Sequence, residues 1–324
     1  MTLLDKNKIL LFSFVFLLGF ISSFSLPPYN LFFINFISYP TLLWILLFYS
    51  KHKVTSFNLG WTFGFSYFIS NLYWITNSLT FEDIFRPLIP FALILIPLFL
   101  GLFYGLSTFI FSCLKPKKNF LSILIFATSL SIFEYIRGSI FGGFPWNLIA
   151  FSFVNYLESI QLLSIIGTYT FNSIVIIFFL LPTILLFNYK LNTKILVLVF
   201  SLLIFLGNFF WGKSNLRAHK FTEREDLGFT IKIISPKIDI NRYFNNENPE
   251  KIILELVQLS KPKEFEKTIF IFPEGVFSNI YLEDLNNYSY IFSENYSDQH
   301  KMILGINSKQ EGKVFNSMVL LDKN

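Results

Sequence analysis

The 324-residue sequence predicts a multi-pass α-helical membrane bundle followed by a smaller α/β domain. Hydrophobic residues make up 53% of the chain and charged residues only 15%, whereas soluble domains average about a quarter charged residues. Long apolar stretches fill the chain up to residue 212, and shorter segments of strand and helix type follow after residue 228. This composition excludes a disordered chain, a collagen-like repeat and a purely cytosolic globule.

The first 212 residues contain seven apolar stretches, each close to the roughly 20 residues that a bilayer-crossing helix needs. The stretches lie near residues 9–26, 31–49, 57–79, 88–114, 119–138, 161–187 and 194–212. We therefore expect a bundle of about seven spans over residues 1–212, a linker over 213–227 and a second domain over 228–324.

Positive charges between the stretches predict the orientation of the bundle. Lysines precede the first stretch and occur in every second loop after it; they are Lys6, Lys8, Lys51, Lys53, Lys115, Lys117, Lys118, Lys190 and Lys194. The loops between them are neutral or mostly acidic. Because basic loops remain in the cytoplasm, we expect a cytoplasmic N-terminus and an outer location for everything after Trp211.

The distribution of the formal net charge of +5 along the chain is explained better by membrane topology than by nucleic-acid binding. Residues 1–212 hold 11 Lys and Arg against 5 Asp and Glu, whereas residues 213–324 hold 15 against 16. The excess lies in the hydrophobic part, so we expect no nucleic-acid partner. The three histidines and the single cysteine are widely spaced, and we expect no metal site.

Three polar residues within the stretches are candidates for a special role. Glu134 and Arg137 are three residues apart, so they can pair on one helix face near the outer end of the fifth stretch. Such a pair either locks helix packing or contacts substrate. Cys113 ends the fourth stretch with no acid or histidine nearby, which favours a small buried residue over a nucleophile.

The fifth loop combines turn residues with aromatic residues. Gly142-Gly143-Phe144-Pro145-Trp146 is followed by residues 147–153, which are apolar but too short to span a membrane. One interpretation is a re-entrant or interfacial segment with Trp146 at headgroup depth. The other is a simple turn in the aromatic belt.

The second domain has the pattern of an α/β layer structure. Strands are expected at residues 229–234, 268–272, 301–306 and 315–321, and helices at 249–259 and 288–296. Glu274 lies just past the apolar strand 268–272, after Pro273, at the end of the strand where α/β proteins place ligand-binding groups. It is either a general base or a solvated turn glutamate.

Four segments taken in order resemble the bacterial apolipoprotein N-acyltransferase family. They are FSLPPYN, GWTFGFSYFISNLYWI, FEYIRGSIFGGFPW and IFIFPEGVFSN. The resemblance implies a helical bundle in the bacterial cytoplasmic (inner) membrane. It also implies a nitrilase-like (carbon–nitrogen hydrolase) domain, an αββα sandwich, on the outer side.

The resemblance further implies acyl transfer without a cofactor. A cysteine thiolate would take a fatty acyl chain from a membrane phospholipid, and the α-amino group of a diacylglyceryl-cysteine apolipoprotein would then accept it. Glu274 matches the general base of the family. Pro145 and Trp146 match a loop near the entry of lipid, and Trp211 matches the aromatic residue that ends the last span before the domain.

One departure from the family concerns its catalytic lysine and cysteine. The segment VFNSMVLLDKN resembles the strand that precedes the lysine, and the sequence ends there. We therefore expect an incomplete domain without either residue, and a fragment that is inactive by itself. Three alternatives remain: a membrane-anchored amidase or nitrilase, a transporter or channel, and a non-catalytic membrane protein.

Overall fold

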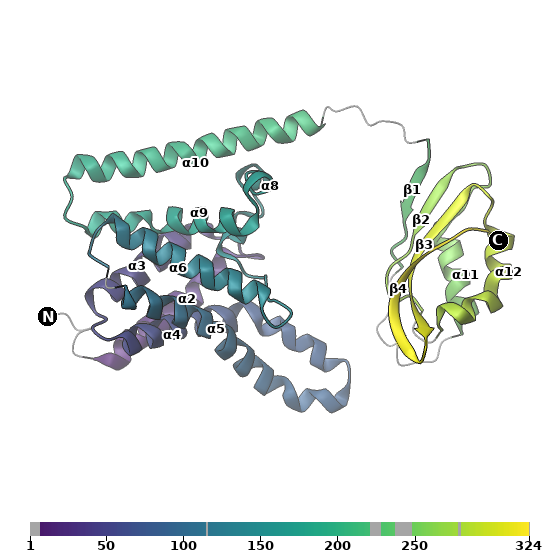
Figure 1. Cartoon of the computed structure of the whole chain (residues 1–324), viewed down its shortest axis with the longest axis horizontal. Coiled ribbons are helices and arrows are strands. Elements are labelled where there is room, and N and C mark those ends of the chain that lie inside the picture. The colour runs from purple at the N-terminus through teal and green to yellow at the C-terminus, as the bar shows by residue number, and fades with distance from the viewer. Residues whose placement is uncertain (1–6, 115, 221–227, 237–247, 278–279, 324) are drawn as a thin grey trace. The chain divides into compact units, whose positions relative to one another are not determined.

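The computed structural model describes residues 7–114, 116–220, 228–236, 248–277 and 280–323. The chain divides into two compact units, Met1–Thr222 and Glu223–Asn324, which Figure 1 draws with their helices and strands labelled. Each unit is described by itself.

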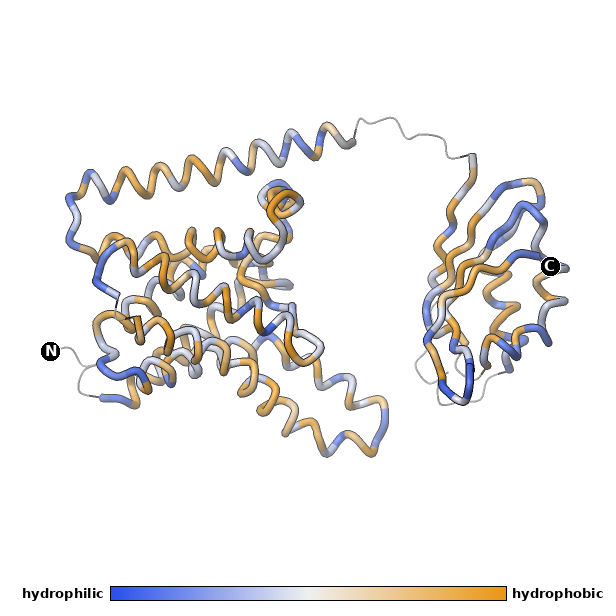
Figure 2. Tube along the Cα trace, in the orientation of Figure 1, coloured by the Kyte–Doolittle hydropathy of each residue, from blue (hydrophilic) through white to orange (hydrophobic). Residues whose placement is uncertain are grey.

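The first unit is a bundle of apolar helices, as Figure 2 shows by the hydrophobic colour along most of their length. Its longer helices are α2 (Lys8–Ser22), α3 (Asn35–Phe48), α4 (Lys53–Leu72), α5 (Ile89–Cys113), α6 (Phe120–Ser139), α9 (Thr168–Leu180) and α10 (Leu191–Lys220). Two single-turn helices, α7 (Leu157–Ile160) and α8 (Leu163–Ile166), precede α9. Short 3₁₀ helices are η1 (Ser23–Ser25), η2 (Phe32–Ile34), η3 (Tyr73–Thr80), η4 (Asp83–Leu88), η5 (Ile149–Phe153) and η6 (Leu181–Leu186).

Five helical segments of the described chain are long and apolar enough to cross a membrane. They are Lys8–Ser25, Asp83–Cys113, Phe120–Ser139, Thr168–Leu186 and Leu191–Ala218. The predicted stretch 31–49 holds a shorter apolar segment, Phe32–Phe48, and the predicted stretch 57–79 holds α4 and η3. The structure therefore gives a helical membrane protein with five candidate spans, and the number seven stays a prediction.

The predicted stretch 161–187 is wrong as one continuous helix. Gly167 has φ +79°, a backbone conformation that ends a helix, so the long helical segment starts at Thr168. The last predicted stretch, in contrast, is longer than expected, because α10 continues to Lys220 beyond the predicted end at residue 212.

Helices α4 and α5 approach each other closely because small residues line their contact. A Cβ atom on Gly60 would lie 2.2 Å from Oγ1 of Thr108. The same Thr108 Oγ1 donates a hydrogen bond to the carbonyl oxygen of Ser56 at 2.8 Å. Small residues and hydroxyl bonds of this kind hold helices together where lipid replaces water.

Helix α10 lies at the edge of the bundle. Its Phe205 ring stacks on Phe178 of α9 with centroids 4.7 Å apart. Its Asn208 donates a hydrogen bond to the carbonyl oxygen of Ser159 at 2.7 Å. Only 6% of its most apolar 18-residue window is buried, so most of this window is exposed at the surface of the unit.

The second unit is a four-stranded sheet with helices on one face. The strands β1 (Thr230–Ile233), β2 (Thr268–Ile271), β3 (His300–Gln310) and β4 (Lys313–Leu321) follow in that order across the sheet. The first three are parallel and β4 is antiparallel to β3. Helices α11 (Pro249–Ser260) and α12 (Ser289–Asn295), with the 3₁₀ helix η8 (Leu282–Tyr288), complete the unit, and both α-helices lie on the same side of the sheet in Figure 1.

The core of the second unit forms where these helices cover the sheet. Phe270 and Met302 are fully buried there, and α11 contributes Ile252, Ile253 and Leu256 to the same cluster. The unit is thus a small mixed sheet with an α/β core. An αββα sandwich with a second sheet stays a prediction.

Candidate functional site

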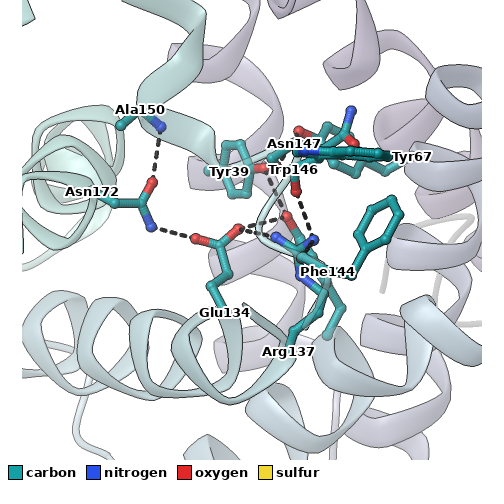
Figure 3. Close-up of polar contacts among 10 residues, drawn as sticks. Tyr39, Tyr67, Glu134, Arg137, Phe144, Trp146, Asn147, Ala150 and Asn172 are labelled. Atoms are coloured by element: carbon teal, nitrogen blue, oxygen red, sulfur yellow. Dashed lines mark hydrogen bonds and ion pairs between the residues drawn. The ribbon is translucent and has the colours of Figure 1, made fainter. Parts of the chain in front are cut away.

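The first candidate site is a polar network inside the bundle, centred on α6 (Figure 3). Arg137 Nη2 lies 3.9 Å from Glu134 Oε1, and the two side chains are 0% and 1% exposed. The predicted pairing of these two residues is confirmed. A buried charge requires a partner of opposite sign, and each of these two residues supplies that charge to the other.

Neighbouring helices supply further donors to the Glu134 carboxylate. Tyr104 of α5 donates its hydroxyl to Oε1 at 3.3 Å, and Asn172 of α9 donates its amide to Oε2. Tyr39 of α3 extends the network through a 3.4 Å contact between its hydroxyl and that of Tyr104. One carboxylate therefore ties together α3, α5, α6 and α9.

Arg137 connects this network to the fifth loop. Its Nη1 donates to the carbonyl oxygens of Phe144 at 2.9 Å and Trp146 at 2.7 Å. Its guanidinium carbon lies 5.2 Å from the ring centroid of Phe68 and 5.8 Å from that of Phe144. The charge of Arg137 is thus used to fix the loop on both sides of Pro145.

The loop is tight enough that glycine is required in it. Gly143 has φ +79°, and a Cβ atom there would lie 2.4 Å from the carbonyl oxygen of Gly138. The Phe144 N–H donates back to the carbonyl oxygen of Arg137 at 2.9 Å. Trp146, 53% exposed, packs near Trp74 of η3 with ring centroids 6.0 Å apart.

The apolar segment after Trp146 enters the bundle. Ile149, Ala150 and Phe153 are each at most 3% exposed and belong to the bundle core. The Ala150 N–H donates to the side-chain oxygen of Asn172 at 2.8 Å. This burial favours the re-entrant interpretation over a simple surface turn.

An apolar cavity of about 370 Å³ lies beside the loop. Its walls come from α5, including Leu95 and Phe99, and from the loop residues Phe141 and Phe144. Phe99 is 46% exposed and Phe141 87% exposed. The cavity therefore combines an apolar wall with aromatic side chains exposed at the surface of the bundle.

The second candidate site is Glu274 in the sheet unit. It lies three residues past the end of β2, after Phe272 and Pro273, and its side chain is exposed. Gly275 has φ +70°, which permits the turn. Asn316 of β4 donates its amide to Glu274 Oε1 at 2.5 Å, and Gly305 of β3 leaves room for the Glu274 backbone, because a Cβ there would lie 3.0 Å from its Cα.

The remaining two predicted residues lie elsewhere. Trp211, 39% exposed, is on α10 and is not part of the network around Arg137. Cys113 ends α5, whereas Phe99 of the same helix contacts the loop residue Phe141 with ring centroids 6.2 Å apart. At about 1.5 Å per residue, Cys113 lies about 20 Å along α5 from that contact.

The described residues bring together no group of three or more His, Cys, Asp or Glu side chains that would hold a metal ion. Four residues of these sites were not predicted from the sequence: Asn172, Tyr104, Tyr39 and Asn316. Asn172 could have been found as an isolated amide in the apolar run TYTFNSIVIIFFL. The tyrosines gave no separate signal in a chain with 20% aromatic residues.

The bundle matches a known family in sequence. Residues 18–181, which include the whole Glu134–Arg137 network and its loop, match the sequence model described as "Apolipoprotein N-acyltransferase N-terminal domain". The chain belongs to the apolipoprotein N-acyltransferase family. The predicted resemblance is thereby confirmed.

Individual members of the family give the extent of the similarity. An apolipoprotein N-acyltransferase of Brucella melitensis is 28% identical over 272 residues, which cover 80% of this chain and 50% of that protein. That of Agrobacterium fabrum is 27% identical over 271 residues, with 79% and 50% covered. That of Rhodopseudomonas palustris is 33% identical over 174 residues, with 52% and 32% covered. The chain spans about half the length of the first curated relatives it matches.

Proposed function

We propose that this chain contributes the membrane bundle and one catalytic carboxylate to the N-acylation of lipoproteins. The observation that carries the proposal is the family match across residues 18–181, which contains the buried network and the loop that it holds. The acyl donor would be a membrane phospholipid, and the acceptor would be an apolipoprotein whose N-terminal cysteine already carries a diacylglyceryl group.

In this proposal the loop with Pro145 and Trp146 receives lipid. Arg137 fixes the backbone on both sides of Pro145, and Trp146 is half exposed beside an apolar cavity whose wall includes Phe144. An acyl chain can enter such a cavity from the bilayer without passing through water. Trp211 on α10 is proposed as a further lipid contact.

Glu274 is proposed as the general base. Glu274 would first take the proton of a cysteine thiol. The resulting thiolate would attack the phospholipid ester carbonyl, forming a thioester while the lysophospholipid alkoxide leaves and takes that proton from Glu274. The amine of the acceptor would then attack the thioester, releasing the thiolate, and Glu274 would take the amine proton. Asn316 donates a hydrogen bond to the Glu274 carboxylate, and the side chain is exposed, so a bound substrate could cover it.

Cys113 is not assigned as this thiolate, because it ends α5 about 20 Å from the loop contact of Phe99. As it is the single cysteine of the sequence, we propose that these 324 residues do not transfer acyl groups by themselves. We further propose the domain division 1–212, 213–227 and 228–324, and a location in the bacterial inner membrane with a cytoplasmic N-terminus.

The proposed substrate class can be tested by photo-crosslinking. Membranes containing the chain are irradiated with a diacylglyceryl-cysteine lipopeptide that carries a photoreactive acyl chain, and labelled peptides are identified by mass spectrometry. Labelling should fall in α5 and the loop around Trp146, and excess unlabelled lipopeptide should suppress it. On α10 only the part near Trp211 should be labelled. Uniform labelling along the whole length of all lipid-facing helices would contradict the proposal.

The proposed lack of independent activity has its own test. Membranes containing the chain are incubated with phospholipid and the diacylated lipopeptide, and the lipopeptide is analysed for a third acyl chain. We expect none. Triacylated product that depends on Glu274, and disappears in Glu274→Gln, would show that these 324 residues are active by themselves.

A further inference from the structure

A basic hollow lies at one end of the bundle. Its volume is about 440 Å³, and Lys8, Lys51 and His52 line it. These three residues come from two separate segments, the first turn of α2 and the connection between α3 and α4. They meet because α2 and α4 begin where α3 ends.

The described residues place no carboxylate against the positive charge of this hollow. Lys8, Lys51 and His52 are all exposed, and the residues that line the hollow include no Asp or Glu. In the described part of the chain, neither lysine takes part in an ion pair, whereas Lys232, Lys263, Lys301 and Lys323 each have a carboxylate within 4.0 Å.

The floor of the hollow is apolar and its wall is polar. Leu11 is 6% exposed and Phe12 is partly buried in the bundle core. Thr55 and Asn58, on the first turns of α4, add a hydroxyl and an amide. The hollow thus presents cations and hydrogen-bonding groups above an apolar floor. It lies at the end of α2, which is part of a helical segment long and apolar enough to cross a membrane.

This combination matches the chemistry of a phospholipid at the membrane surface. A lipid phosphate carries the negative charge, and the acyl chains next to it contact the apolar floor. Basic pockets between transmembrane helices are known to bind anionic headgroups. A free phosphate ion would use the cations but would gain nothing from Leu11 and Phe12.

We propose that this hollow binds the headgroup of an anionic phospholipid. The site is separate from the loop around Trp146 and does not depend on the proposed acyl transfer. It would hold a resident lipid at the face of the membrane where α2 and α4 begin.

The test compares two double variants of the full chain that lose the same charge. Lys8→Gln/Lys51→Gln removes two cations from the hollow. Lys117→Gln/Lys190→Gln removes two exposed cations from the same end of the bundle but not from the hollow. Two contacts place the control residues at this end. Lys118, next to Lys117, lies 3.7 Å from the ring centroid of Phe48 at the end of α3. The Phe120 N–H donates to the hydroxyl of Tyr189, next to Lys190, at 3.1 Å.

Lipid binding is measured by native mass spectrometry of the detergent-solubilised protein, titrated with phosphatidylglycerol or with phosphatidylcholine of identical chains. The unchanged chain should retain phosphatidylglycerol in preference to phosphatidylcholine. The hollow variant should bind phosphatidylglycerol roughly tenfold more weakly or worse, and the control variant should bind it normally. A thermal unfolding curve in the same detergent checks that both variants are folded.

Three results would overturn the proposal. Equal losses in the two variants would mean that only the diffuse charge of this face attracts lipid. Equal retention of the two lipids would mean that only the apolar floor binds. Displacement of phosphatidylglycerol by millimolar inorganic phosphate at matched ionic strength would identify the hollow as a site for the free anion instead.

Discussion

Arg137 Nη1 lies 2.7 Å from the carbonyl oxygen of Trp146, nine residues further along the chain. The same nitrogen donates to the carbonyl oxygen of Phe144, so one buried guanidinium determines where the loop around Pro145 lies. The Glu134 carboxylate balances the charge from one helical turn earlier. The shape of the exposed loop therefore depends on a pair of residues that lipid and water do not reach.

The first prediction is that Arg137→Ala destabilises the bundle and releases the loop. Removing one partner of a buried ion pair leaves the other charge uncompensated, which costs about 3–5 kcal/mol. The free energy of unfolding in detergent should fall by that amount, and hydrogen exchange should rise at the amides near residue 144.

A matched control is available on the surface of the same unit. Arg86 and Asp83 are also three residues apart in sequence, and Arg86 Nε lies 3.0 Å from Asp83 Oδ1. Their side chains, however, are 61% and 88% exposed. Arg86→Ala should change stability by only about 0–1 kcal/mol. Similar effects of the two substitutions would mean that burial does not make the Glu134–Arg137 pair special.

The second prediction separates crowding from backbone strain in the loop. Gly142 and Gly143 have φ values of +83° and +79°, so alanine at either position costs about 1–2 kcal/mol in a left-handed conformation. A Cβ atom on Gly142 meets nothing within 4 Å, whereas one on Gly143 would lie 2.4 Å from the carbonyl oxygen of Gly138. Gly143→Ala should therefore lower the unfolding temperature clearly more than Gly142→Ala; equal shifts would contradict this geometry.

Sequence patterns predicted the parts of the bundle that depend on local spacing. The interval of three residues between Glu134 and Arg137 was enough to expect their pairing, because a helix brings such residues to one face. Their partners Tyr104 and Asn172 lie 30 and 38 residues from Glu134. Only the packing of separate helices brings them together, and no local pattern encodes it.

In the sheet unit all four strands were expected, but the last two are longer than predicted. β3 continues four residues past its predicted end to Gln310, and β4 begins two residues before its predicted start, at Lys313. Glu311 and Gly312 join them with φ values of +49° and +75°, as in a two-residue hairpin turn. Polar residues extend these strands because backbone pairing, which a hydropathy pattern does not show, stabilises them.

The third prediction concerns the proposed orientation. In the proposed orientation, Lys118 lies in a cytoplasmic loop, and an odd number of spans puts the sheet unit on the outer side. Reporter insertions at Lys118 and at Gly312, a hairpin position that should tolerate insertion, should therefore give opposite signals for cytoplasmic and outer location. The same signal from both positions would refute the orientation, and a reporter at Lys190 should agree with the one at Lys118.

The last prediction is a loss of stability of the sheet unit at alkaline pH. Tyr296 is 4% exposed, its hydroxyl lies 2.7 Å from that of Ser260, and burial raises its pKa to about 12. The neutral phenol is thus favoured in the folded state. Its stabilising contribution is fully present below the unfolded pKa of about 10 and is lost as pH rises toward 12, by roughly 1 kcal/mol per pH unit.

The core residue Met302 provides a reporter for this transition. The chain has three methionines, and Met302 is fully buried in the sheet unit, so its ¹³C-methyl NMR signal follows the unfolding of that unit in urea. The urea midpoint should fall between pH 9 and pH 11. Tyr296→Phe should be less stable at pH 9, by about 1 kcal/mol for the lost hydrogen bond, but should show a smaller fall over the same pH range. Because the phenylalanine cannot ionise, an unchanged fall in this variant would assign the alkaline transition to other groups.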